Sequence, residues 1–175
     1  MKKTTTKTLT LSALFAAVIF VATAILPLPL GNGYANLGDT FIAVAAFFVG
    51  PVWGFFAAAL GSCLADVFLG YGIYAPATFL IKGSMALVFI LVFRPFAKSR
   101  VATVAALAAS VAAEALMIGG YFVFECIMYS PAGAIPNISG NLIQGAFAVA
   151  ATTCLISVFV NNKTLMKNSR LKTLV

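Results

Sequence analysis

The chain has 175 residues, of which 62% are hydrophobic and only 9% are charged, with eleven bases, four acids and no histidine. Soluble domains contain about 45–50% apolar and roughly 25% charged residues, so this composition excludes a water-soluble globular domain. It also excludes disorder, because disordered chains are poor in aromatic residues and this chain has 16 phenylalanines. The composition indicates an integral membrane protein, and the length suits one compact bundle of several spans.

The absence of histidine removes most catalytic and metal-binding arrangements. Helical zinc motifs, Ser–His and Cys–His nucleophilic pairs and histidine-ligated haem all require an imidazole. The three cysteines, Cys63, Cys126 and Cys154, lie far apart in apolar runs and share no Cys-x-x-Cys spacing. We therefore predict no enzyme activity, no metal and no cofactor, and we interpret the cysteines as packing residues.

Five hydrophobic runs follow one another along the chain, at 9–30, 41–69, 77–93, 101–128 and 138–160. A membrane-spanning helix needs about 20 residues, so the second run is long enough for one kinked helix or for two short ones. Gly50-Pro51 interrupts this run. Proline lacks an amide donor and disfavours helix at the preceding residue, which is compatible with either alternative.

The distribution of the bases decides between them. Ten of the eleven bases form three clusters, at the N-terminus, between the third and fourth runs, and at the C-terminus. Cytoplasmic segments of membrane proteins collect Lys and Arg, and all three clusters fall on one side only if the second run is a hairpin of two spans. We therefore predict an all-α membrane protein, one domain over 1–175, with six transmembrane helices and both termini in the cytoplasm. The predicted helices are 9–30, 38–49, 52–69, 77–93, 101–128 and 138–160.

Two ionisable residues lie at a similar depth in neighbouring predicted helices. Asp66 is late in the third helix and Lys82 is early in the fourth. Ionisable residues inside a bilayer are costly and usually pair with one another. We expect a structural Asp66–Lys82 ion pair; the alternative is that Lys82 faces a cavity and offers its ammonium group to a ligand.

The fifth and sixth predicted helices each carry one polar stripe. The stripes consist of Glu114, Tyr121 and Glu125 in the fifth helix and Asn137, Asn141 and Gln144 in the sixth. Their spacing puts each set on one helical face, and such a face borders a cavity or another helix rather than lipid. Because amides both donate and accept hydrogen bonds, we predict a ligand pocket in the outer half of the bilayer. Interhelical hydrogen bonding is the alternative.

Two other features point to function. The segment 31–39 contains Tyr34, Asn36 and Asp39 together with glycines, and we predict that it forms a lid, since binding groups concentrate in loops on rigid scaffolds. An interfacial aromatic belt is the alternative. In the first helix, Ala13 and Ala17 share one face, and this small-xxx-small spacing lets another helix approach closely.

Short motifs of glycine and polar residues occur in a definite order along the chain. They are Asn36-Leu37-Gly38-Asp39, Gly50-Pro51 with Gly54, Gly61 with Asp66, Tyr74-Ala75-Pro76 before Ile81-Lys82-Gly83, and Asn141 with Gln144-Gly145. This ordered series resembles the substrate-binding S component of an energy-coupling factor (ECF) vitamin transporter. It is similar to the riboflavin-type branch, which includes S components for hydroxymethylpyrimidine and pyridoxine.

The resemblance implies a prokaryotic cell-membrane subunit that binds a vitamin with high affinity near the outer face, under the loop between the first two helices. It implies as partners a transmembrane scaffold (the T component), in contact with Ala13 and Ala17, and two ATPases. No Walker A sequence occurs in the chain, so ATP hydrolysis is expected only in the partners. The residues expected to bind substrate are Asn36, Lys82, Glu114, Tyr121, Glu125, Asn137, Asn141 and Gln144.

The polar groups favour a small neutral or weakly basic ring with hydroxyls, hence pyridoxine or hydroxymethylpyrimidine ahead of riboflavin. Two other functions stay open. One is a small autonomous permease, coupled to protons through Glu114 and Glu125. The other is a structural or assembly protein that binds no vitamin.

Overall fold

The computed structural model describes residues 6–25, 28–30 and 33–168. Its elements in chain order are α1 (Thr6–Ala24), β1 (Leu28–Leu30), β2 (Gly33–Ala35), α2 (Gly38–Val49), α3 (Pro51–Phe68), α4 (Ala75–Phe93), a 3-10 turn (Arg94–Phe96), α5 (Ala102–Tyr129), α6 (Pro131–Asn161) and α7 (Lys163–Asn168). In this part of the chain, five helices are long and apolar enough to cross a membrane, and α2 is a shorter apolar helix. The chain is thus a helical multi-pass membrane protein, as predicted, while the count of six spans stays a prediction.

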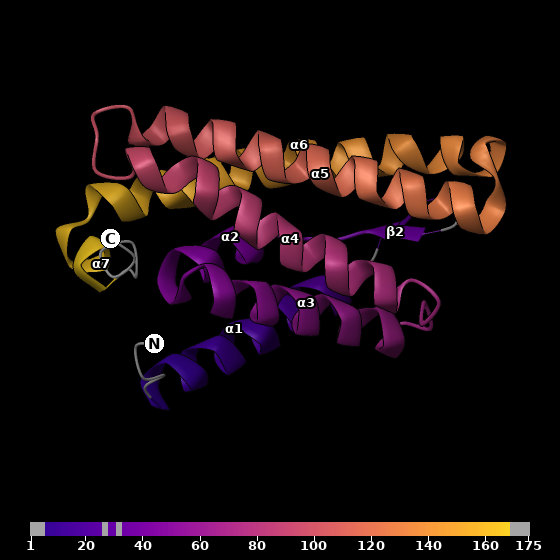
Figure 1. Cartoon of the computed structure of the whole chain (residues 1–175), viewed down its shortest axis with the longest axis horizontal. Coiled ribbons are helices and arrows are strands. Elements are labelled where there is room, and N and C mark those ends of the chain that lie inside the picture. Colours follow the sequence, from indigo (N-terminus) through magenta and orange to yellow (C-terminus); the bar gives the residue numbers. More distant parts are fainter. Residues whose placement is uncertain (1–5, 26–27, 31–32, 169–175) are drawn as a thin grey trace.

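The ends of the helices sort into two groups. The start of α1, the connection between α4 and α5, and α7 lie at one end of the molecule, and β2 and the connection between α5 and α6 lie at the other (Figure 1). The first three segments carry the described basic clusters. One basic end and one base-free end is the pattern that the positive-inside rule expects.

The Gly50-Pro51 interruption is a turn between two helices. Gly50 has φ 84°, in the left-handed region that favours glycine, and its amide donates to the Ala46 carbonyl at 3.0 Å, which closes α2. Pro51 takes the first position of α3, where a missing amide costs nothing. Local backbone chemistry therefore accounts for the reversal of direction between α2 and α3.

Two helix boundaries differ from the prediction. α1 ends at Ala24 rather than at residue 30, because prolines occupy positions 27 and 29. Leu28–Leu30 instead pairs antiparallel with Gly33–Ala35, and β2 contacts α6. At the same end of the bundle, α6 begins at Pro131 rather than at residue 138, with Ser130 Oγ accepting from the Gly133 amide at 3.4 Å. The hairpin and this long helix together frame the base-free end.

An aromatic core fills the half of the bundle near the basic end. Phe47, Phe89 and Phe93 are at most 1% exposed, and the Phe47 ring centroid lies 6.2 Å from that of Phe93 and 5.8 Å from that of Phe159. These residues stand near the ends of α2, α4 and α6. Asp66, Lys82 and Glu125 are buried in the other half of the bundle.

Candidate functional site

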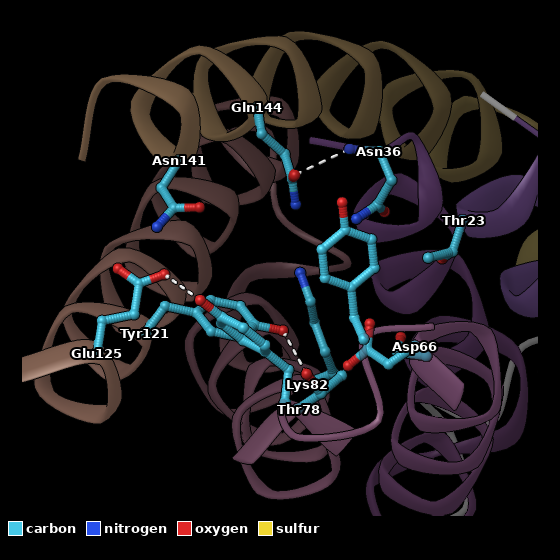
Figure 2. Close-up of a pocket in the computed structure, with 12 residues that line it drawn as sticks. Thr23, Asn36, Asp66, Thr78, Lys82, Tyr121, Glu125, Asn141 and Gln144 are labelled. Carbon is cyan, nitrogen blue, oxygen red and sulfur yellow. Dashed lines mark hydrogen bonds between the residues drawn. The ribbon is translucent and has the colours of Figure 1, made fainter. Parts of the chain in front are cut away.

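A pocket lined by polar side chains lies among the helices. Five helices and the connections next to them contribute to its wall. The lining residues are Thr23, Asn36, Ser62, Asp66, Tyr71, Tyr74, Thr78, Lys82, Tyr121, Glu125, Asn141 and Gln144 (Figure 2). A polar wall of this kind inside an apolar bundle is suited to binding a polar solute.

Lys82 forms its ion pair with Asp39. Its Nζ lies 2.5 Å from Asp39 Oδ1, and the two side chains are 3% and 1% exposed. Asp39 stands in the first turn of α2, where the helix dipole favours a carboxylate. The structure thus pairs Lys82 with Asp39, an acid that the sequence analysis did not consider for this role, and the Asp66–Lys82 pair stays a prediction. Asp66 was expected because its position in the sequence puts it at a membrane depth similar to that of Lys82. However, α2 begins at the same level and brings Asp39 against α4. Asp66 lines the pocket.

Asp39 extends this ion pair into a network that reaches α6. Gln144 Nε2 donates to Asp39 Oδ2 at 2.5 Å, and the Asn36 amide donates to Gln144 Oε1 at 2.9 Å. Asn36 Oδ1 in turn accepts from the Gly38 amide at 2.9 Å. Such a satisfied buried network specifies one arrangement of its members. It ties the segment before α2 to α4 and α6.

This network changes the place of Asp39, which was predicted to belong to the lid. Asp39 belongs to α2 and is buried, so it is part of the bundle interior rather than of a loop. Asn36 does lie between β2 and α2, at the pocket wall. The side chain of Tyr34 lies outside the described residues, although its backbone forms part of β2.

Tyrosines and a glutamate build the opposite part of the wall. Tyr74 Oη donates to Glu125 Oε1 at 3.3 Å, and the hydroxyls of Thr78 and Tyr121 lie 2.9 Å apart. Burial raises the pKa of Tyr74, which keeps its hydroxyl protonated. The Tyr74 ring centroid lies 6.4 Å from those of Tyr71 and Tyr121. This side of the pocket thus presents aromatic rings next to a carboxylate.

Glu125 keeps one acceptor oxygen unused. The residue is 3% exposed, and its Oε2 makes no hydrogen bond to any described residue. Figure 2 shows Glu125 and Asn141 on one side of the pocket, Asp66 and Thr23 on the other, and Lys82 pointing between them toward Gln144. Charged and amide groups from four helices, α3 to α6, therefore surround one space.

The pocket gathers six of the eight residues predicted to bind substrate. These are Asn36, Lys82, Tyr121, Glu125, Asn141 and Gln144. Glu114 and Asn137 do not line it. Glu114 is buried where α5 meets Gly145 of α6, and Asn137 is buried beside Glu125. Each stripe therefore has one member behind the wall rather than in it.

Five further wall residues carried no predicted binding role. They are Thr23, Ser62, Tyr71, Tyr74 and Thr78. Helical spacing does mark two of them, since Ser62 precedes Asp66 by four residues and Thr78 precedes Lys82 by four. Hydroxyls are weak signals in membrane helices because they often bond to their own backbone, as Ser110 does to the Ala106 carbonyl at 2.8 Å.

Ala13 and Ala17 lie on the outer side of α1, and both are exposed. The inner side of α1 packs on α3, where a Cβ added to Gly61 would come 2.5 Å from the Ala16 carbonyl oxygen. The face with the two alanines is therefore turned away from the α1–α3 contact.

Comparisons with known proteins point to one family. The family model for the S component of the ECF-type riboflavin transporter matches residues 3–161. A Pyrococcus woesei protein, described as "Uncharacterized protein in gap 3'region", is 32% identical over 124 residues, which are 71% of this chain and 80% of that protein. A solved structure, described as the S component of a bacterial ECF transporter, matches with a TM-score of 0.66 at 22% identity, over 89% of this chain and 96% of that one.

Proposed function

We propose that this chain, which belongs to the family of ECF-type riboflavin transporter S components, binds a small water-soluble vitamin or vitamin precursor in the pocket of Figure 2. The observation that carries the proposal is the pocket itself, a space lined by polar side chains inside a bundle of apolar helices. Family and pocket both support a substrate-binding subunit rather than an enzyme.

The wall chemistry supports a small hydroxylated heterocycle. Asn141 and Gln144 offer amides that donate and accept, and Tyr74 and Tyr121 offer ring faces together with hydroxyls. Pyridoxine and hydroxymethylpyrimidine match this mixture best, and riboflavin, which the family description names, is the third candidate. The proposed binding set is Asn36, Lys82, Tyr121, Glu125, Asn141 and Gln144, with Thr23, Ser62, Asp66, Tyr71, Tyr74 and Thr78 completing the wall.

Delivery requires partners. We expect the chain to work with a T component and two ATPase subunits, which hydrolyse the ATP, in the cell membrane of a prokaryote with both termini in the cytoplasm. The exposed pair Ala13 and Ala17 on α1 is the proposed contact with the T component, because small residues permit close helix approach. The β1–β2 hairpin and Asn36 are proposed to close the pocket, through the hydrogen bond from the Asn36 amide to Gln144.

A second candidate is an autonomous permease that couples uptake to protons. It is favoured by Glu114 and Glu125, two buried carboxyl groups whose Oε2 atoms make no hydrogen bond within the described ranges. Ionisable groups of this kind occur in proton relays. Under this alternative the chain transports without ATPases.

Uptake of a labelled vitamin separates the two functions. The chain is expressed in cells that lack every ECF module and in cells that contain one. The S-component function predicts accumulation only with the module and no effect of a protonophore on binding. Full uptake without the module, abolished by a protonophore, contradicts the S-component function and supports the permease.

A further inference from the structure

The charges on the outside of the bundle have one sign. All four acids of the chain are buried, each at most 5% exposed. By contrast, Lys7, Lys98, Arg100 and Lys163 are exposed and Arg94 is half-buried. Within the described ranges, none of these five bases forms an ion pair with an Asp or Glu side chain. The outer bases are therefore available to an anionic partner from outside the chain.

The five bases lie at the basic end of the bundle. Figure 1 places the start of α1, the α4–α5 connection and α7 at this end. α7 is held against the bundle: Asn162 Oδ1 accepts from the amides of Thr164 and Leu165 at 3.0 and 3.2 Å, and Met166 packs against the hydrophobic core. Lys163 is thereby kept beside the other bases, and the positive charge is concentrated at one level of the molecule.

Three of the bases belong to one short turn, residues 94–100, which we call the basic turn. The Phe96 carbonyl accepts from the amide and the hydroxyl of Ser99 at 2.9 and 2.8 Å, and Ser99 Oγ accepts from the Val101 amide at 3.3 Å. Ala97, in the middle of the turn, is 3% exposed and belongs to the hydrophobic core. These hydrogen bonds and the buried alanine fix the backbone that carries the exposed bases.

Apolar side chains stand next to the bases of this turn. Phe96 is 49% exposed and Val101 is 50% exposed. The turn lies where Ala75–Phe96 ends, and this helix is long and apolar enough to cross a membrane. Long basic side chains reach the headgroup level while apolar neighbours stay in hydrocarbon. A soluble anion would neutralise the bases but leave both apolar side chains in water, so the combination favours a lipid.

We propose that the basic turn binds the phosphate group of an anionic phospholipid, with Lys98 and Arg100 on the phosphate and Phe96 against the upper part of the acyl chains. A guanidinium group donates two parallel hydrogen bonds to a phosphate, and a lysine adds a compact positive charge. Lys7 and Lys163 strengthen the attraction at the same end but lie outside the site. The proposal is independent of vitamin binding, because no residue of the basic turn lines the described pocket.

The first test measures the lipid preference of the unaltered full chain in detergent. Phosphatidylglycerol and phosphatidylcholine with identical acyl chains are added in equal amounts, and native mass spectrometry compares the lipids that stay bound. Each base near a headgroup strengthens the attraction about fivefold, so phosphatidylglycerol is expected to exceed phosphatidylcholine by at least about tenfold. The ratio should fall as salt is added, because salt screens exposed charges. Equal retention of the two lipids, or retention of neither, overturns the proposal.

The second test assigns the preference to the basic turn. Lys98→Gln combined with Arg100→Gln is expected to lower the ratio of the two bound lipids at least about fivefold. Lys7→Gln combined with Lys163→Gln removes the same charge at the same end and is the matched control, expected to lower the ratio less than about twofold. Equal losses in the two double variants contradict the site, because total charge would then explain the preference. The single variants Lys98→Gln and Arg100→Gln give the same comparison if the double variant does not fold.

The third test separates a lipid from a soluble phosphate. Phe96→Ala keeps every charge of the basic turn and removes the apolar contact, so both lipids are expected to be retained less while their ratio stays the same. Glycerol 3-phosphate, which carries the phosphate without acyl chains, is expected to leave phosphatidylglycerol bound. Displacement of the lipid by glycerol 3-phosphate, or unchanged lipid retention in Phe96→Ala, overturns the lipid assignment.

Discussion

The buried ion pair between Lys82 and Asp39 leads to a quantitative prediction about stability. Lys82 Nζ and Asp39 Oδ1 lie 2.5 Å apart, and both side chains are almost completely shielded. Removing one partner of a buried pair costs about 3–5 kcal/mol, because the other charge stays buried and uncompensated. Lys82→Met is therefore expected to lower the free energy of unfolding by about 3–5 kcal/mol, and with it the yield of folded protein.

A double-mutant cycle identifies the partner. Asp39→Asn combined with Lys82→Met removes both charges, and we expect a coupling energy of about 2–3 kcal/mol, near the upper end for residues in contact. The matched cycle with Asp66→Asn is expected to give less than about 1 kcal/mol. Denaturant unfolding in detergent, followed by the fluorescence of Trp53, the single tryptophan, measures both cycles. A larger coupling to Asp66 than to Asp39 would refute the assignment.

Three further predictions concern topology, coupling and binding. In a cysteine-free background, a cysteine at Gly33 should react with an impermeant reagent added outside and one at Pro51 should not; labelling at 51 contradicts the six-span topology. Ala17→Trp should leave vitamin binding intact but abolish ATP-dependent uptake, because a bulky group blocks close helix approach; lost binding would place this face inside the bundle. Asn141→Ala should raise the Kd up to about tenfold, since a neutral hydrogen bond contributes about 0.5–1.5 kcal/mol. Gln144→Ala should cost more, because Gln144 also holds Asp39 and Asn36, and equal effects in calorimetry would contradict that role.

Patterns that act along a single helix predicted much of this structure. The basic clusters and Gly50-Pro51 predicted that the second apolar run divides into two helices, and α2 and α3 are the result. Helical spacing likewise placed Tyr121 with Glu125, and Asn141 with Gln144, on pocket-facing sides of α5 and α6. The first inference needs only the order of charges and of Gly-Pro along the chain, and the second needs only the period of the helix.

Contacts between helices were harder to predict. The partner of Lys82 depends on where α2 begins relative to α4. The residue pattern within one helix does not contain this information, and so Asp66 was predicted instead of Asp39. The β1–β2 hairpin was not predicted, because Leu28 and Leu30 continue the apolar run of α1. The prolines within that run were the signal that the helix ends earlier. Helical periodicity specifies the polar face of one helix, while tertiary packing decides which faces meet.

Mass spectrometry of the small molecules that co-purify with the protein shows whether the pocket of this S-component-family chain binds a vitamin. The chain and its Gln144→Ala variant are purified in detergent from the same host, washed identically and denatured to release bound compounds. Vitamin binding in this pocket predicts a near-stoichiometric nitrogen heterocycle from the unaltered chain and a strongly reduced amount from the variant, which should still fold. Equal amounts from both proteins, or no such compound from the unaltered chain even after incubation with pyridoxine, hydroxymethylpyrimidine and riboflavin, would contradict it.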